Sequence, residues 1–214
     1  MNLYEQHISV FISNPWEEAK WIEVCKEKRW KPIHVVNYTP DGCLSADPRQ
    51  FMMSKYCHRD NSQSAIDSVK SLSSEIRDMG FKVVRTKVEG MLANREFDTL
   101  NIKGKEGVYW EFHAKVCNSF EGLMSLYKKK VQEDKLYRDH VAISMSMYSS
   151  VKPLIVTIRV NEGTRDEALR IKNYILDDLK KEGFHIEGKI QSEVSIYDDC
   201  SRQDFGWFAS HSKL

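Results

Sequence analysis

Glutamate and histidine recur in this chain at a spacing that suits acid–base chemistry. Glu5 and His7 form one Glu-x-His pair, and Glu111 and His113 form a second. Side chains alternate along a β-strand, so residues two apart point to the same face. A carboxylate beside an imidazole can orient it, share its proton or join it as a metal ligand. We therefore predict that His7, His113, Glu5 and Glu111 are catalytic.

The two pairs belong to a longer internal repeat. His7 and His34 are separated by the same number of residues as His113 and His140. Later segments also align at a nearly constant offset: 50–65 with 153–168, and Gly80-Phe81 with Gly183-Phe184. Self-similarity at a fixed offset indicates two copies of one structural unit.

Each copy has the pattern strand–helix–strand–strand–helix–strand. Alternating residues predict opening strands at 7–13 and 108–116, and apolar residues at helical spacing predict helices near 65–79 and 168–179. Thr164 and Glu167 match a capping box, which begins the last helix. The order βαββαβ is the ferredoxin-like arrangement, with helices on one face of an antiparallel sheet. We predict an α+β fold of two tandem ferredoxin-like repeats. Their sheets would pack face to face or join edge to edge into a barrel-like form.

The repeat sets the predicted boundaries of the units. The first βαββαβ repeat covers 1–92, a linker covers 93–107, and the second repeat covers 108–196. A C-terminal tail at 197–214 carries Trp207 and Phe208, which could dock as a strand or strap. The acidic residues Asp198, Asp199 and Asp204 could contribute ligands, but we interpret them as part of a solvated tail.

One face of each sheet should carry the ionisable residues. In 108–116, Trp110 and Phe112 fall on the apolar face that packs under helices, and Glu111 and His113 fall on the other. Equivalent positions of the other strands supply further predicted residues. The expected ligand-binding residues are His34, His140, Lys115, Arg159 and Lys87; the candidate ligands for a divalent metal are His7, His113, Glu89 and Glu193.

Composition limits the classes of partner. The 32 Lys and Arg residues nearly balance the 31 Asp and Glu residues, so no global positive charge favours nucleic acid. No apolar run approaches the roughly 20 residues that span a bilayer. The five cysteines are odd in number and form no CxxC pair, which predicts a reducing, cytoplasmic location. We expect neither a nucleic acid nor a membrane as partner, and the pattern leaves the oligomeric state open.

Two known arrangements offer comparison. His7-Ile8-Ser9 resembles the His-x-Ser/Thr motif of duplicated two-histidine phosphoesterases, but His113-Ala114-Lys115 departs from it. The motif occurs once where that family needs two. A metal site built by equivalent strands of two βαβ-containing halves is the second comparison, and it would draw on the Glu and His candidates.

The favoured function is a small-molecule hydrolase or lyase acting on a phosphate- or carboxylate-bearing anion. The alternative is a non-catalytic small-ligand-binding or assembly module, in which the alternating polar residues are only the wet side of an open sheet. The two candidate functions predict different surroundings for the histidines. A closed, water-poor site around the His pairs favours the enzyme, and an open, exposed sheet favours the alternative.

Overall fold

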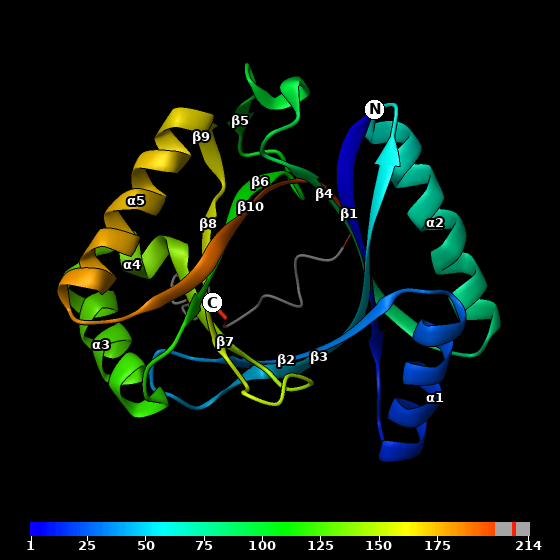
Figure 1. Ribbon diagram of the computed structural model, residues 1–214, viewed down its shortest axis with the longest axis horizontal. Helices are drawn as coiled ribbons and strands as arrows, with labels where there is room; N and C mark the ends of the chain where they lie inside the picture. The colour runs from blue at the N-terminus through cyan, green and yellow to red at the C-terminus, as the bar shows by residue number, and fades with distance from the viewer. Residues whose placement is uncertain (200–206, 209–214) are drawn as a thin grey trace.

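Eight strands of the chain close into a single antiparallel barrel (Figure 1). The computed structural model describes residues 1–199 together with Trp207 and Phe208, and it describes only the backbone of residues 45–48. In this part of the chain the fold is mixed α+β, with five α-helices and ten strands. The eight barrel strands are all paired with antiparallel neighbours.

The helices and strands follow one another in nearly the predicted order. The first half of the chain supplies β1 (Asn2–Phe11), α1 (Pro15–Glu27), β2 (Lys31–Tyr38), β3 (Leu44–Arg59), α2 (Ser62–Asp78) and β4 (Lys82–Met91). The connecting stretch supplies η1, a short 3-10 helix (Arg95–Phe97), and β5 (Asn101–Lys103). The second half supplies β6 (Tyr109–Val116), α3 (Phe120–Glu133), α4 (Lys135–His140), β7 (Val141–Ser146), β8 (Leu154–Val160), β9 (Glu162–Thr164), α5 (Arg165–Lys181) and β10 (Ile186–Asp198).

The two halves meet along the edges of their strands. The first half contributes β4-β1-β3-β2 and the second contributes β10-β6-β8-β7, in that spatial order. Pairing of β2 with β7 and of β4 with β10 closes the barrel. Of the two arrangements predicted, the sheets join edge to edge and do not pack face to face. Closure pairs the strand edges that two separate sheets would leave exposed.

Local sequence signals fix the ends of the helices. The Asn14 side chain caps α1 by accepting from the backbone N–H groups of residues 16 and 17, and Pro15 occupies the first helical turn. Thr164 and Glu167 form the predicted capping box at the start of α5. Gly80 and Gly183 follow the ends of α2 and α5 with φ of 88° and 85°, a conformation that glycine adopts without strain.

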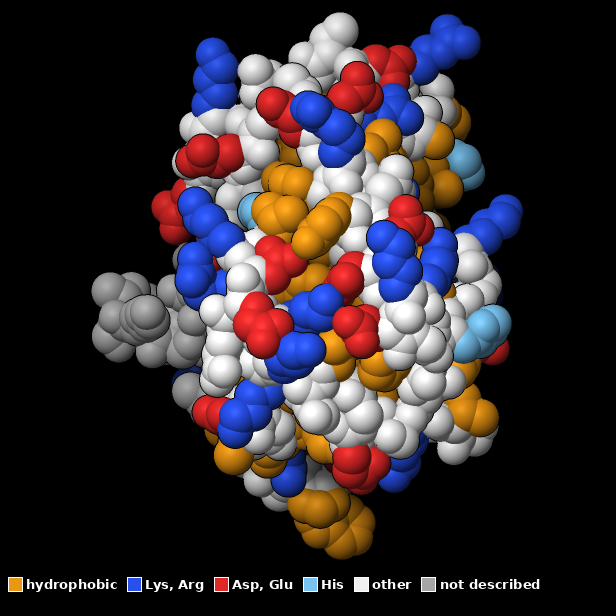
Figure 2. Space-filling model, turned by 90° about the vertical axis from the view of Figure 1, so that its left-hand side faces the viewer, with side chains coloured by type: hydrophobic (Ala, Val, Ile, Leu, Met, Phe, Trp, Pro, Cys, Tyr) orange, Lys and Arg blue, Asp and Glu red, His pale blue; other side chains and the backbone are white. Residues whose placement is uncertain are grey.

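The apolar core lies outside the barrel, between its outer face and the helices. Helices α1 and α2 cover one side, and α3, α4 and α5 cover the opposite side (Figure 1). Trp110 and Phe112 of β6 are fully buried in this core, as their predicted face requires. Figure 2 shows both signs of charge interspersed on the surface of the α3–α5 side. None of the described helices is long and apolar enough to cross a membrane.

The predicted linker contains regular secondary structure. Its strand β5 pairs with β9, and Phe97 of η1 packs against the backbone of Gly90 in β4. A Cβ atom added at Gly90 would lie 2.3 Å from the Phe97 ring. The connection between the halves therefore rests on β4 through a contact that only glycine permits.

We predict that Gly90→Ala destabilises the fold by about 2 kcal/mol, because the added methyl group overpacks a buried contact. Urea unfolding measures the change in free energy. Ser74→Ala, at an exposed position of α2, is the matched control and should change stability by less than about 0.5 kcal/mol. Equal stabilities of the two variants would contradict the close packing of Phe97 on β4.

Candidate functional site

The register of the barrel strands points a set of glutamates into the interior. Directly paired residues on neighbouring strands project from the same face. Glu5 pairs with Glu89, and Glu111 pairs with Glu193. Each of the four is at most 4% exposed. Because a buried charge needs a partner, four carboxylates in one enclosed space demand compensation.

Three of these glutamates and two histidines form a group that we call the carboxylate–histidine cluster: Glu5, His7, Glu89, His113 and Glu193. His7 Nε2 lies 2.8 Å from Glu89 Oε2 and 3.8 Å from Glu5 Oε1. The Gln191 amide donates to Glu5 Oε2 at 2.7 Å and to Glu193 Oε2 at 3.0 Å. Among the described residues, Glu193 Oε1 has no hydrogen-bond partner. The cluster therefore has spare capacity for a cation or a proton.

The protonation of the cluster is uneven. Burial, followed by the charges of Glu89 and Glu5, raises the pKa of Glu193 well above its ordinary value. Burial also raises the pKa of Glu5, but His7 and the Ser54 hydroxyl outweigh it and lower this pKa to about 2. Burial lowers the pKa of His7, but Glu5 and Glu89 outweigh it and raise this pKa. A proton on Glu193 thus relieves repulsion that a metal cation would also relieve.

A second group, the Glu111 ion-pair group, consists of Glu111, Lys87 and Arg159. Arg159 donates to Glu111 Oε1 from Nε at 3.0 Å and from Nη2 at 2.8 Å, and Lys87 Nζ contacts Oε2. Lys87 Nζ also lies 2.7 Å from Glu89 Oε1, which joins this group to the cluster. Burial raises the pKa of Glu111, but Lys87 and Arg159 outweigh it and hold this pKa well below its ordinary value. Glu111 is therefore suited to be a counter-ion rather than a proton acceptor.

Asp198 extends this network inside the barrel. Its carboxylate accepts from Arg85 Nε at 2.9 Å and from the Tyr109 hydroxyl at 2.7 Å. Burial raises the pKa of Asp198, but Arg85 outweighs it and lowers this pKa to about 2. The interpretation of Asp198 as part of a solvated tail is wrong. A register shift between Ser195 and Tyr197 turns the last residue of β10 inward, and alternation in the sequence does not reveal such a bulge.

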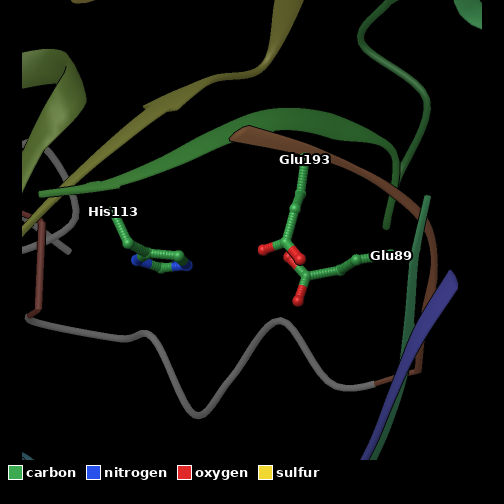
Figure 3. Close-up of side chains that lie close together, drawn as sticks. All are labelled: Glu89, His113 and Glu193. Atoms are coloured by element: carbon green, nitrogen blue, oxygen red, sulfur yellow. The ribbon is translucent and has the colours of Figure 1, made fainter. Parts of the chain in front are cut away.

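Three side chains of the cluster can converge on one metal ion. Figure 3 shows His113 pointing toward Glu89 and Glu193. The ligand atoms of these three residues all lie within 4.8 Å of one another. Carboxylate oxygens and imidazole nitrogens bind a metal such as zinc at about 2.0–2.2 Å, so small side-chain rotations would bring them onto one ion. All three belong to the four predicted metal candidates, and the fourth, His7, contacts Glu89.

Solvent reaches the cluster from the side of His113. Its side chain is 26% exposed, compared with 12% for His7. His113 Nδ1 lies 3.0 Å from the Thr157 hydroxyl, which fixes the orientation of the ring. Tyr56, half exposed, lies 3.2 Å from the Gln191 amide. A ligand entering past Tyr56 would therefore meet His113 and Gln191 before the buried carboxylates.

Three of the predicted ligand-binding residues lie apart from the cluster. His34 is outside the barrel, stacked on Phe51 with ring centroids 4.0 Å apart, so the prediction that it shares the inner face is wrong. Both faces of β2 mix apolar and polar residues, and polarity therefore does not identify its inner side. His140 ends α4, with Nδ1 2.8 Å from the carbonyl oxygen of Arg159. Lys115 is exposed at the end of β6. The predicted residues Lys87 and Arg159 lie in the interior.

Comparisons with known proteins add no assignment. No protein-family model matches the chain, and no curated protein matches its sequence.

We predict that Glu193→Gln stabilises the metal-free protein at alkaline pH. Since the folded-state pKa of Glu193 is raised above 4.5, its stabilising contribution is complete below that pH and is lost as the pH rises toward the folded-state pKa. Glutamine avoids this loss. With EDTA at about pH 8, the melting temperature of the variant should exceed that of the unmodified protein by about 2–6 °C. The gap should vanish near pH 4.5. A gap that does not change with pH would contradict the raised pKa.

Glu111→Gln should have the opposite effect, because it leaves Lys87 and Arg159 buried without their carboxylate. We expect a loss of about 3 kcal/mol in the free energy of unfolding, measured with urea at neutral pH. Glu133→Gln, at an exposed position of α3, is the control and should be nearly neutral. A Glu111→Gln protein as stable as this control would show that Glu111 is not the required counter-ion.

Proposed function

We propose that the protein is a divalent-metal-dependent hydrolase that acts on a small phosphate-bearing anion inside the barrel. One observation carries the proposal: the carboxylate–histidine cluster and the Glu111 ion-pair group are both buried and are in contact with each other. One group has excess negative charge and suits a metal cation, and the other supplies positive charge for an anion. Lys87 lies between them, in contact with both Glu89 and Glu111.

The enclosed position of the histidines supports an enzyme over an open interaction surface. Both His7 and His113 face the inside of a closed barrel, where the effective dielectric is low. Charges there act strongly on a bound substrate and need no reorganisation. The shifts in pKa at Glu5, His7 and Glu193 are typical of such a site.

The residues of the cluster suit different roles. Glu89, His113 and Glu193 would hold the metal, and such a metal would lower the pKa of a bound water. His7, whose pKa is raised by Glu5 and Glu89 against the effect of burial, would hold a proton at Nε2 for a leaving oxygen. Glu5, kept ionised, would orient His7. Glu111 would position Lys87 and Arg159, whose charges attract the anion.

We also propose that the two halves are copies of one ferredoxin-like unit. Their matching strand orders support this, with β1 and β6 in equivalent central positions. His7 of β1 and His113 of β6 then occupy corresponding strands and face the same interior. Cys25, Cys43, Cys57 and Cys117 are all free thiols, which is consistent with the proposed cytoplasmic location.

The test is a screen for hydrolysis of phosphomonoesters and phosphodiesters by protein stripped of metal and then supplied with Mg²⁺, Mn²⁺ or Zn²⁺. We expect metal-dependent turnover. The His7→Ala/His113→Ala double variant should lose at least about 100-fold in kcat/KM, because it lacks both the proton donor and a metal ligand. His34→Ala is the matched control, since its imidazole lies outside the barrel.

Each outcome bears on one part of the proposal. Activity that survives in the double variant would contradict the assignment of His7 as proton donor and His113 as metal ligand. Metal binding is checked separately, as a rise in melting temperature with Mn²⁺ that Glu89→Gln/Glu193→Gln removes. Binding of metal and phosphate without any turnover would favour the alternative of a non-catalytic small-ligand-binding protein.

A further inference from the structure

An aromatic pair from near the C-terminus lies inside the barrel. Trp207 and Phe208 are 6% and 1% exposed, and they form a small apolar cluster with Ala142 that is separate from the main core. Ala142 of β7 pairs with Thr157 of β8, so its side chain points into the same interior as the Thr157 hydroxyl that contacts His113. Residues 200–206 and 209–214 of the predicted tail lie outside the described residues.

The pair packs on a cation of the Glu111 ion-pair group. The Phe208 ring centroid lies 4.8 Å from Arg159 Cζ, and the Trp207 centroid lies 5.8 Å from it. The Tyr109 ring centroid lies 4.0 Å from the same Arg159 atom. The indole N–H of Trp207 donates to the carbonyl oxygen of Ile143 at 3.2 Å. The pair therefore covers the guanidinium that the proposed function assigns to the anion.

We propose that Trp207 and Phe208 form an intramolecular inhibitor. The pair occupies the part of the barrel interior next to Arg159, and it is displaced when a phosphate-bearing ligand binds there. The proposal rests on the proposed function for the identity of the site. It concerns the regulation of that site, and it does not depend on whether the bound anion is hydrolysed.

The chemistry of the contacts makes the pair displaceable. Its contacts with the described part of the chain include ring–guanidinium contacts, burial of apolar surface and the Trp207 hydrogen bond. A phosphate oxygen forms charge-assisted hydrogen bonds with a guanidinium, and these are stronger and more directional than contact with a ring face. The inhibitor is covalently tethered, so its local concentration is high whatever the protein concentration.

Occupancy of the site by the pair should lower the apparent affinity for the anion. If only a fraction of molecules has the pair displaced, the apparent dissociation constant rises by the inverse of that fraction. The two rings contact each other, with centroids 5.2 Å apart, and both contact Arg159. A single substitution would leave one ring in place, so the informative variant removes both.

The experiment compares the full-length protein with its Trp207→Ala/Phe208→Ala variant. Binding of inorganic phosphate in the presence of Mg²⁺ is measured by titration calorimetry. We expect the double variant to bind phosphate about tenfold more tightly. Trp16→Ala is the matched control, because Trp16 is 86% exposed on α1, and it should bind phosphate like the unmodified protein. Unchanged or weaker binding by a folded double variant would overturn the proposal.

A second measurement needs no stable double variant. The fluorescence of Trp207 is isolated as the difference between the unmodified protein and Trp207→Phe. Adding phosphate should shift this emission to longer wavelength and make it more accessible to acrylamide, because the indole leaves a buried site. Phosphate binding that leaves the emission of Trp207 unchanged would overturn displacement.

The two proposals fail in different ways. Tighter phosphate binding by the double variant, with no hydrolysis by either protein, would support the intramolecular inhibitor and contradict the proposed enzymatic function. Hydrolysis with the same kcat/KM in both proteins would contradict the intramolecular inhibitor and support the proposed enzymatic function.

Discussion

The need to compensate buried charge inside a closed barrel is the constraint on which this structure depends. Glu5, Glu89, Glu111, Glu193 and Asp198 all lie in or beside the interior, and none is more than slightly exposed. Within the described part of the chain, all of them except Glu193 form an ion pair with a Lys, Arg or His side chain. Glu111 binds two cations, Asp198 binds Arg85, and Glu5 is paired with His7 and accepts hydrogen bonds. The charge on Glu193 is not balanced in this way, and its raised pKa follows.

The barrel explains why so many ionisable groups tolerate burial. Eight strands enclose an interior about wide enough for side chains to fill, so oppositely charged groups from different strands meet at hydrogen-bonding distance. The apolar faces of the same strands pack under the helices, where the hydrophobic core forms. Apolar packing and ion pairing thus lie on opposite faces of one sheet. The outer face buries apolar surface, and the inner face holds the ion pairs.

The two Glu-x-His pairs have different electrostatic surroundings. Glu5 and Glu111 both precede a histidine by two residues, but Glu5 accepts hydrogen bonds beside His7, whereas Glu111 neutralises Lys87 and Arg159. Two strands contribute the difference, since β4 places Lys87 and Glu89 between the halves and β8 supplies Arg159. The three candidate metal ligands are likewise unequally divided between the halves. Glu89 comes from β4 of the first half, and His113 and Glu193 come from β6 and β10 of the second.

Features that depend only on neighbouring residues can be read from the sequence. Alternation along 108–116 placed Trp110 outward and Glu111 inward, and the capping box at Thr164 began α5, because strand parity and helix caps are local. Other features depend on contacts between distant segments. His34 lies outside because pairing with β3 sets its face, and Asp198 lies inside because a bulge in β10 reverses the parity. The protonation of Glu193 depends on carboxylates that only barrel closure brings together, so no local pattern encodes it.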